Sequence, residues 1–253
     1  MTFSISIHVD GYYGLVKGVP NLLNLFDNYG IKATFFVNMG KEANLFQILK
    51  YRKKNKISKT DSKIFSRYNK RQLIEILFLN RKLGNKYSRI LKDIKIRGHE
   101  VEPHCWSHLL WSKNFENINH TKEILKMKKA YFKIFNKNPI GFAPPTWKYN
   151  SKIINILKKE GFEYISISGP KNKVYFEYGL KIIPLSFNKT IEELLNDGKN
   201  KEEILNIYEK EMKKEYVNLY FHSDFEGIKG IKLLEEVIKI VNNKKTLLCG
   251  EIL

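Results

Sequence analysis

Short apolar runs alternate with longer amphipathic stretches along most of this 253-residue chain. Residues 4–9 alternate apolar and polar side chains and lead into Asp10-Gly11, which predicts a strand that ends in a loop. Residues 19–29 have helical spacing, with Pro20 near the start and Gly30 after the end, which predicts a helix. The same criteria predict further strands at 33–37, 100–102, 140–142, 164–167, 181–185, 217–221 and 246–249. They predict further helices at 121–135, 151–159, 201–213 and 228–241.

This alternation of strands and helices indicates the fold class. No internal linker rich in Gly, Pro or Ser interrupts it, so residues 1–253 are predicted to form one α/β domain with a mainly parallel sheet. A barrel is the natural way to close such a sheet at this chain length. In α/β barrels the functional side chains gather where strands end and loops begin.

The positive charge is concentrated in one segment. Between Lys50 and Arg97 there are 17 Lys or Arg and three acidic residues, a net charge of +14 out of +19 for the chain. We therefore predict a basic insertion at about residues 45–97. Its interleaved aromatic and aliphatic residues suit a surface that lies on an anionic membrane through residues 50–97. The alternative is an insertion of solvated lysines around a helix packed on the core.

Composition also limits the partners and the compartment. Lysines outnumber arginines 39 to six, whereas sites that read phosphates or bases favour arginine, so no nucleic-acid partner is expected. Cys105 and Cys249 are the two cysteines, too few for a disulfide-stapled scaffold. No apolar run approaches the roughly 18 residues of a spanning helix, and residues 1–9 lack a secretory pattern. We expect a cytoplasmic protein, peripheral on the inner face of the membrane if the basic segment binds lipid.

Titratable residues follow several predicted strands. They are His8 and Asp10 after the first strand, His104 and His108 after the third, and His222 with Asp224 and Glu226 after a late one. Such convergence of polar groups from several strand ends is typical of a barrel active site.

A metal site is the preferred interpretation of His104, His108 and Asp10. The two histidines are four residues apart, which on a helical turn places both imidazoles on one face. Asp10 from another strand would complete a set of two histidines and one carboxylate with room for water. These ligands suit a divalent zinc, cobalt, manganese, nickel or iron ion. Two histidines at this spacing are by themselves weak support for a metal site. The prediction rests on their combination with Asp10.

The pattern resembles the polysaccharide deacetylase superfamily, which contains the NodB homology domain and carbohydrate esterase family 4. Within it, the chain is most similar to the deformylases that act on undecaprenyl-phosphate-linked 4-formamido-arabinose. The resemblance rests on Val9-Asp10, Lys17-Gly18-Val19-Pro20, Ile31-Lys32-Ala33-Thr34-Phe35-Phe36, the segment from Gly98-His99-Glu100 to His108, Trp147-Lys148, Ile183-Pro184 and Phe221-His222-Ser223-Asp224-Phe225-Glu226-Gly227.

This resemblance implies a fold and an activity. The fold is a distorted (β/α)7 barrel, and the activity is hydrolysis of an N-formyl or N-acetyl group from an amino sugar, with a polyprenyl phosphate or cell-envelope carrier. Asp10, His104 and His108 are implied as metal ligands, and His222 as the acid that protonates the leaving amine.

Two positions depart from the family pattern. His8 occupies the position of the usual aspartate base, and Ala143 matches an arginine that usually steadies that base. A neutral imidazole can act as a base, and His8 shares a strand face with Asp10. Two alternatives stay open: His8 is an additional metal ligand, or hydrolysis has been lost and the protein only binds a sugar or a lipid-linked sugar.

Four further residues are candidates for substrate binding: Trp147, Lys148, Asp224 and Glu226. Trp147 would stack on a sugar ring, although a tryptophan at a barrel mouth can simply fill space. Lys148 would meet a phosphate, although this chain has many lysines. Asp224 and Glu226 would recognise an amino sugar, orient His222 or cap the next helix.

Overall fold

The computed structural model describes residues 2–43, 47, 50–51, 69–79, 82–169, 171–241 and 245–252. Within these residues, eight strands form two sheets of order β3-β2-β1-β8 and β4-β5-β7-β6. The strands are β1 (Thr2–Val9), β2 (Thr34–Asn38), β3 (Glu100–Cys105), β4 (Gly141–Phe142), β5 (Tyr164–Ile167), β6 (Tyr175–Glu177), β7 (Leu180–Pro184) and β8 (Tyr216–His222). All neighbouring pairs described are parallel except β6 with β7.

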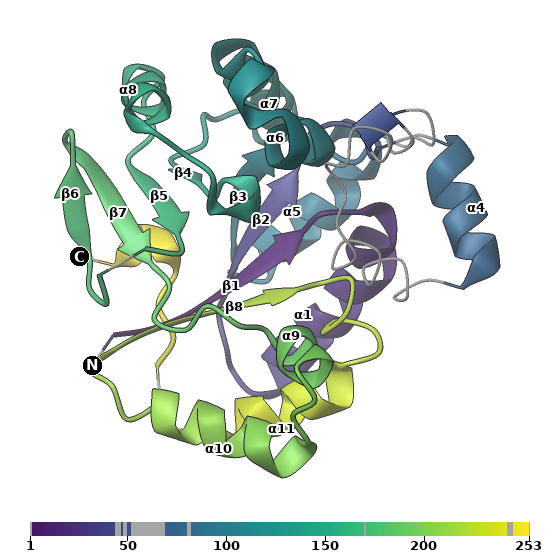
Figure 1. The fold of residues 1–253 in the computed structure, drawn as a ribbon, viewed down its shortest axis with the longest axis vertical. Coiled ribbons are helices and arrows are strands. Elements are labelled where there is room, and N and C mark those ends of the chain that lie inside the picture. Colours follow the sequence, from purple (N-terminus) through teal and green to yellow (C-terminus); the bar gives the residue numbers. More distant parts are fainter. Residues whose placement is uncertain are drawn as a thin grey trace.

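The two sheets join into a distorted barrel (Figure 1). The backbone N–H of Ala143 donates to the carbonyl of Pro103 at 3.5 Å, which joins β4 to β3. The backbone N–H of Ser186 donates to the carbonyl of Asn218 at 3.1 Å, which joins the end of β7 to β8. The seven parallel strands therefore form one closed surface, as expected for a (β/α)7 barrel.

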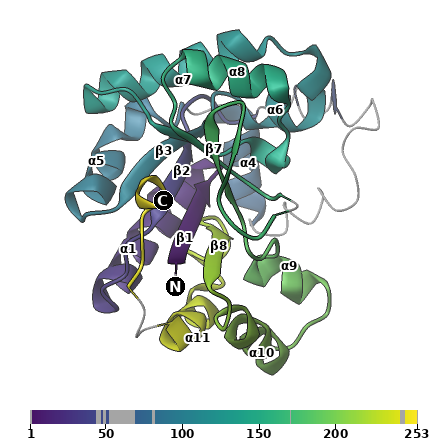
Figure 2. The same ribbon diagram turned by 90° about the vertical axis from the view of Figure 1, so that its left-hand side faces the viewer.

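Helices cover the outside of the barrel (Figures 1 and 2). They are α1 (Val19–Asn28), α5 (Ser88–Ile96), α6 (His108–Asn114), α7 (His120–Phe135), α8 (Ser151–Lys159), α9 (Ile191–Asn196), α10 (Lys201–Glu211) and α11 (Ile231–Val241). Short helical turns are η1 (Gly14–Gly18), η3 (Asn85–Tyr87), η4 (Phe115–Asn117), η5 (Pro145–Trp147) and η6 (Cys249–Glu251). One further helix, α4 (Lys70–Leu79), stands away from the barrel. None of the helices described is long and apolar enough to cross a membrane.

Apolar and polar side chains alternate along β1, and the two kinds face different environments. Ile5 and Ile7 face outward into the main apolar core beneath the helices, whereas Ser4, Ser6 and His8 occupy the opposite face and line the barrel interior. A smaller apolar cluster fills part of that interior: Phe36, Ala143, Tyr164, Ile183, Cys249 and Ile252. The polar face of β1 is therefore buried, so its side chains need partners inside the barrel.

Most predicted elements are confirmed, with a few differences. The predicted strand at 246–249 is wrong, because Leu247 makes only an isolated bridge to Ser4 before the turn η6 begins. β3 extends to Cys105, beyond the predicted range, and therefore contains His104. The range predicted for the basic insertion includes α5, which buries Leu91 and Ile94 in the outer core of the barrel.

Candidate active site

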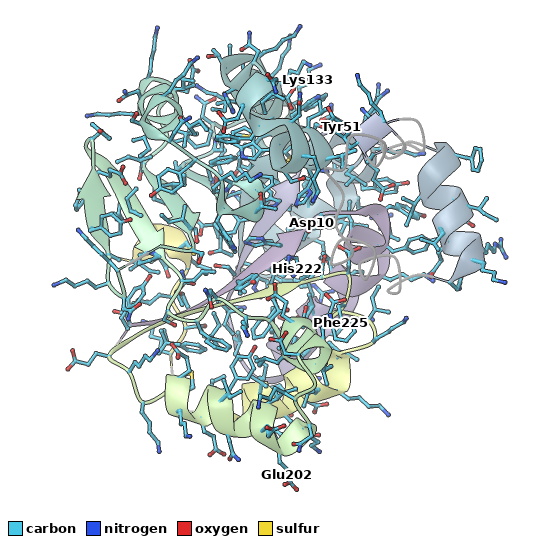
Figure 3. The ribbon with its side chains drawn as sticks, in the orientation of Figure 1. Asp10, Tyr51, Lys133, Glu202, His222 and Phe225 are labelled. Atoms are coloured by element: carbon cyan, nitrogen blue, oxygen red, sulfur yellow. The ribbon has the colours of Figure 1, made fainter. Side chains whose placement is uncertain are left out.

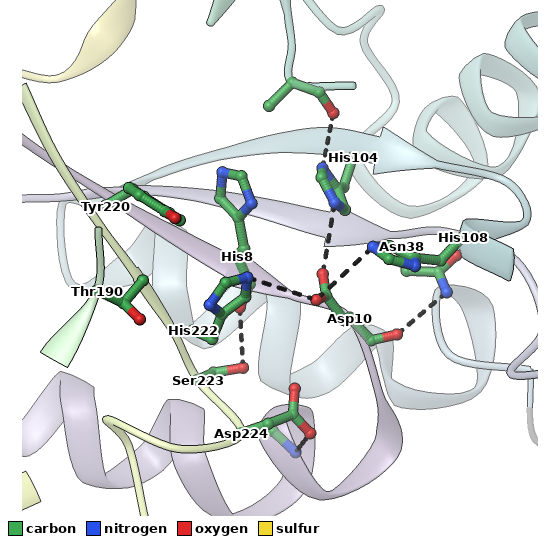
Figure 4. Close-up of polar contacts among 12 residues, drawn as sticks. His8, Asp10, Asn38, His104, His108, Thr190, Tyr220, His222, Ser223 and Asp224 are labelled. Atoms are coloured by element: carbon green, nitrogen blue, oxygen red, sulfur yellow. Dashed lines mark hydrogen bonds and ion pairs between the residues drawn. The ribbon is translucent and has the colours of Figure 1, made fainter. Parts of the chain in front are cut away.

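Four histidines surround the carboxylate of Asp10 at the carboxyl ends of the strands (Figures 3 and 4). Asp10 Oδ1 lies 3.4 Å from His104 Nε2. Asp10 Oδ2 lies 3.7 Å from His108 Nε2 and 3.8 Å from His222 Nε2. The ring of His8 lies 4.6 Å from that of His104 and 5.6 Å from that of His222, measured between centroids. The structure thus brings together the five residues predicted as ligands or catalytic groups.

The register of the parallel strands explains this convergence. His8 on β1 pairs directly with His222 on β8, and the backbone N–H of Ser223 donates to the carbonyl of His8 at 2.9 Å. Asp10 follows His8 by two residues, so the two side chains lie on the same face of the strand. The loop after β1 is held by Asn38, whose side-chain amide donates to the Asp10 carbonyl at 3.2 Å.

His104 and His108 reach the same carboxylate by a different route from the predicted one. We expected both imidazoles on one helical turn, but His104 belongs to β3 and His108 is the first residue of α6. The chain turns between them at Ser107, which has an extended backbone conformation. The two rings still lie 5.3 Å apart, so the four-residue spacing spans a strand-to-helix junction.

The tautomer of His104 is fixed by Ala143. His104 Nδ1 lies 2.6 Å from the Ala143 carbonyl oxygen, which can only accept a hydrogen bond, so Nδ1 carries the proton. Nε2 therefore presents a lone pair toward the Asp10 carboxylate. Metal-ligating histidines are typically oriented in this way by a second hydrogen bond. Ala143, which departs from the family pattern in its side chain, contributes its backbone.

Electrostatics favours neutral imidazoles at His8 and His104 beside an ionised Asp10. Burial, followed by repulsion from His104 and His222, lowers the pKa of His8 well below its ordinary value. Burial also lowers the pKa of His104 to about 3. Burial alone would raise the pKa of Asp10, but His108, His104 and the other imidazoles outweigh it and hold that pKa far below its usual range. At neutral pH, Asp10 is ionised while His8 and His104 offer lone pairs.

These residues fit a divalent metal ion. Among the residues that the structure describes, His8 Nε2 and Asp10 Oδ1 are buried and have no hydrogen-bond partner. Ligand atoms of His8, Asp10 and His104 all lie within 4.8 Å of one another. An imidazole lone pair facing a carboxylate is unfavourable without a cation between them. Asp10 and His104 belong to both the predicted ligand set and this cluster, while His8 and His108 are rival third ligands.

Aromatic rings enclose one side of His8. Trp147 and Tyr220 lie 4.9 Å and 5.6 Å from its ring and 5.1 Å from each other. Thr146 and Trp147 both adopt left-handed backbone conformations, with φ of 53° and 58°, which are uncommon for such residues. Sequence analysis missed Tyr220, although it precedes His222 by two residues on β8 and so shares its face.

The other three predicted substrate-binding residues contact the protein itself. The Lys148 ammonium donates to the Ser112 carbonyl at 2.8 Å. Asp224 is buried and accepts from the Gly14 backbone N–H at 3.0 Å. Glu226 is buried and accepts from the backbone N–H groups of His222 at 2.9 Å and Glu192 at 3.0 Å. These contacts support the alternative that Asp224 and Glu226 hold the loop around His222, and a role in substrate binding stays a prediction.

A closed parallel barrel with imidazoles and one carboxylate at its carboxyl end defines a barrel enzyme with a candidate hydrolytic centre. The polysaccharide deacetylase family profile matches residues 4–165, which is more than half of the chain. The chain belongs to the polysaccharide deacetylase family, whose members are hydrolases, and the predicted resemblance is confirmed.

Two relatives cover nearly the whole chain. A protein of Shewanella sediminis (strain HAW-EB3), named as a 4-deoxy-4-formamido-L-arabinose-phosphoundecaprenol deformylase, is 28% identical over 92% of this chain and 79% of its own. A protein of Wigglesworthia glossinidia brevipalpis with the same name is 27% identical over 93% of this chain and 86% of its own. At this identity the chain is a distant relative of these deformylases.

The fold is shared with solved structures. A structure from Mycobacterium smegmatis, named as a polysaccharide deacetylase, has a TM-score of 0.65 with 16% identity. The match covers 96% of this chain and 84% of that one. This agreement confirms the predicted barrel of the NodB type.

Proposed function

We propose that this protein is a metal-dependent hydrolase that removes an N-formyl group from an amino sugar carried on a polyprenyl phosphate. The family membership supports hydrolysis, and the two relatives named as deformylases support this substrate class. The observation that carries the proposal is the pair of half-buried Asp10 and buried His104, with His8, His108 and His222 gathered around it.

The residues suit a division of roles. A divalent ion held by Asp10 and His104, together with His108 or His8, would lower the pKa of a water molecule and polarise the acyl oxygen. His8 is neutral at pH 7 because burial lowers its pKa, so it is ready to accept a proton. Its depressed pKa also makes it a weak base. His222, which pairs with His8 across β1 and β8, would donate a proton to the departing amine.

The rings packed against His8 limit the edge at which its imidazole can accept a proton. Trp147 and Tyr220 pack against His8 and exclude water from that side. Proton transfer at His8 therefore takes place at the edge that faces Asp10, His104 and His222. A general base typically accelerates such a reaction by about 10²–10⁴-fold.

The decisive experiment combines turnover with metal analysis. Purified protein is incubated with undecaprenyl-phosphate-linked 4-formamido-arabinose, and formate release is measured beside the metal content. We expect formate release, slower release of acetate from the acetamido analogue, and faster release of formate from His8→Asp. Bound metal without turnover of either sugar would favour a binding protein over a hydrolase. Activity that is the same in wild type and His8→Asp would contradict the role of His8 as base.

A further inference from the structure

Helix α4 belongs to an excursion of the chain that leaves and returns at one point beside the barrel. Lys41 and Lys82 form an antiparallel bridge, and the Leu83 backbone N–H donates to the Gly40 carbonyl at 2.9 Å. This neck follows β2, whose carboxyl end lies at the level of the candidate active site. Lys41 and Lys82 therefore lie together at the end of the barrel at which Asp10 lies.

One face of α4 exposes large apolar side chains. Ile74 is 57% exposed and Phe78 is 69% exposed. They are four residues apart on one helix, so they lie next to each other on its surface. The Arg71 side chain is 89% exposed one turn before Ile74. Adjacent exposed apolar residues that follow basic residues on one helix are typical of an interaction surface.

The attachment of α4 fixes its position relative to the site. Glu75 accepts a hydrogen bond from the Tyr13 hydroxyl at 2.7 Å, and Tyr13 lies three residues after Asp10. Lys17, in the same segment, places its ammonium 5.4 Å from the centre of the Tyr13 ring. Figure 1 shows α4 on the side of the molecule toward which the arrows of β1 and β8 point. Helix α4 therefore lies beside the barrel mouth.

The charge of the excursion identifies the kind of partner. Residues 42–81 contain 11 Lys or Arg and three acidic residues. Each Lys or Arg near an anionic membrane contributes about 1 kcal/mol of attraction. A basic segment with adjacent apolar side chains matches an anionic lipid surface, where the apolar groups enter the headgroup boundary. A nucleic acid would satisfy the charge but would leave Ile74 and Phe78 exposed.

We infer that α4 docks the barrel mouth onto an anionic membrane, with Ile74 and Phe78 entering the lipid and Lys70 and Arg71 of the same helix contacting the headgroups. Docking in this orientation presents the Asp10 site to the lipid surface. The inference deepens the proposed function, because a sugar on a polyprenyl phosphate is reached at that surface. Membrane binding itself needs no turnover, so it can hold even if the proposed hydrolysis does not.

Cosedimentation with vesicles tests this docking. Wild-type protein is mixed either with vesicles of phosphatidylcholine alone or with vesicles that also contain anionic phosphatidylglycerol. We expect binding to the anionic vesicles only, which weakens as salt rises. The double variant Ile74→Ser/Phe78→Ser should bind at least about tenfold more weakly, because the apolar contribution is lost.

Phe176→Ser is the matched control. Phe176 is also 69% exposed, but it lies on β6, at the opposite edge of the molecule in Figure 1. This variant should bind like wild type, and formate release from a water-soluble formamido sugar should be equal in all three proteins. Three results would overturn the inference: equal binding to neutral vesicles, equal loss in the Phe176 variant, or retention on duplex DNA without binding to vesicles.

Discussion

Two polar layers lie inside the barrel, one below the other on the same strands. The lower layer is formed by Ser4 and Ser6 of β1, Asn218 of β8, and Glu100 and Glu102 of β3. The Ser4 and Ser6 hydroxyls donate to Asn218 Oδ1 at 3.0 Å and 3.4 Å. Glu100 accepts from the Thr34 hydroxyl at 2.7 Å, and Glu102 accepts from the backbone N–H of Gly141 at 3.0 Å.

The upper layer continues the same strand faces but is satisfied differently. It contains His8 two residues after Ser6, His104 two residues after Glu102, and His222 four residues after Asn218. Within the described part of the chain, His8 Nε2, His222 Nδ1 and Asp10 Oδ1 are buried without hydrogen-bond partners.

The difference between the layers separates a structural role from a functional one. Burying a polar group without a partner costs free energy. Such atoms also occur elsewhere in the described chain, for example His120 Nε2 and Glu211 Oε1, whereas in the upper layer three of them gather at one site. The lower layer satisfies its groups within the protein and so contributes to stability. The upper layer keeps its donors and acceptors for a ligand, which is the physical reason to place chemistry there.

The largest expected effect comes from removing the central charge of the upper layer with Asp10→Asn. Metal affinity should fall by more than about 100-fold, which exceeds the loss typical of residues that only support a ligand. Deformylation should fall with it. The measurement is metal content after dialysis, together with the shift in melting temperature on adding a chelator, which should disappear in the variant.

Ser6→Ala is the control from the lower layer, on the same strand and face. It should retain metal, because the Ser6 hydroxyl contacts Asn218 and Cys249 rather than the histidines. Stoichiometric metal in Asp10→Asn, or loss of metal in Ser6→Ala, would contradict the division into two layers.

The residues of the upper layer could be predicted from the sequence because each of them stands at the end of a predicted strand. His8, Asp10, His104 and His222 all stand at strand ends, and the parallel topology brings strand ends together without further information. Tyr220 was missed because an aromatic residue within a strand is usually a core residue, and only the contact of its ring with that of His8 shows that it lines the site. The carboxylate of Glu226 suggested substrate binding, and its backbone partners depend on a loop that no spacing rule describes. The lower layer was not recognised, since serines alternating with isoleucines indicate a strand and nothing about what lies inside.

An intermediate effect is expected for Asn218→Ala in the lower layer. Asn218 is buried, accepts from two serine hydroxyls, and donates to the Pro184 carbonyl at 3.1 Å. Its truncation leaves these groups without partners and should lower the free energy of unfolding by about 2 kcal/mol. Urea unfolding measures the loss, and metal content should be unchanged. A stable variant that no longer binds metal would show that the two layers are coupled.

The smallest effect should come from Glu226→Gln, which acts on the upper layer through the backbone. Glu226 accepts from the backbone N–H groups of His222 and Glu192, one on each carboxylate oxygen. A glutamine keeps one acceptor and turns an amide donor toward the other N–H, so the His222 loop shifts while the buried volume is preserved. We expect kcat to fall about tenfold with metal content and KM nearly unchanged, because His222 is displaced and the ligands are not. The dependence on the leaving group separates this effect from a general loosening of the site: an O-formyl ester analogue, whose alcohol needs much less protonation to leave than an amine does, should lose much less activity in the variant. An equal loss on both substrates would assign Glu226 to stability alone and would move it from the upper layer to the lower one.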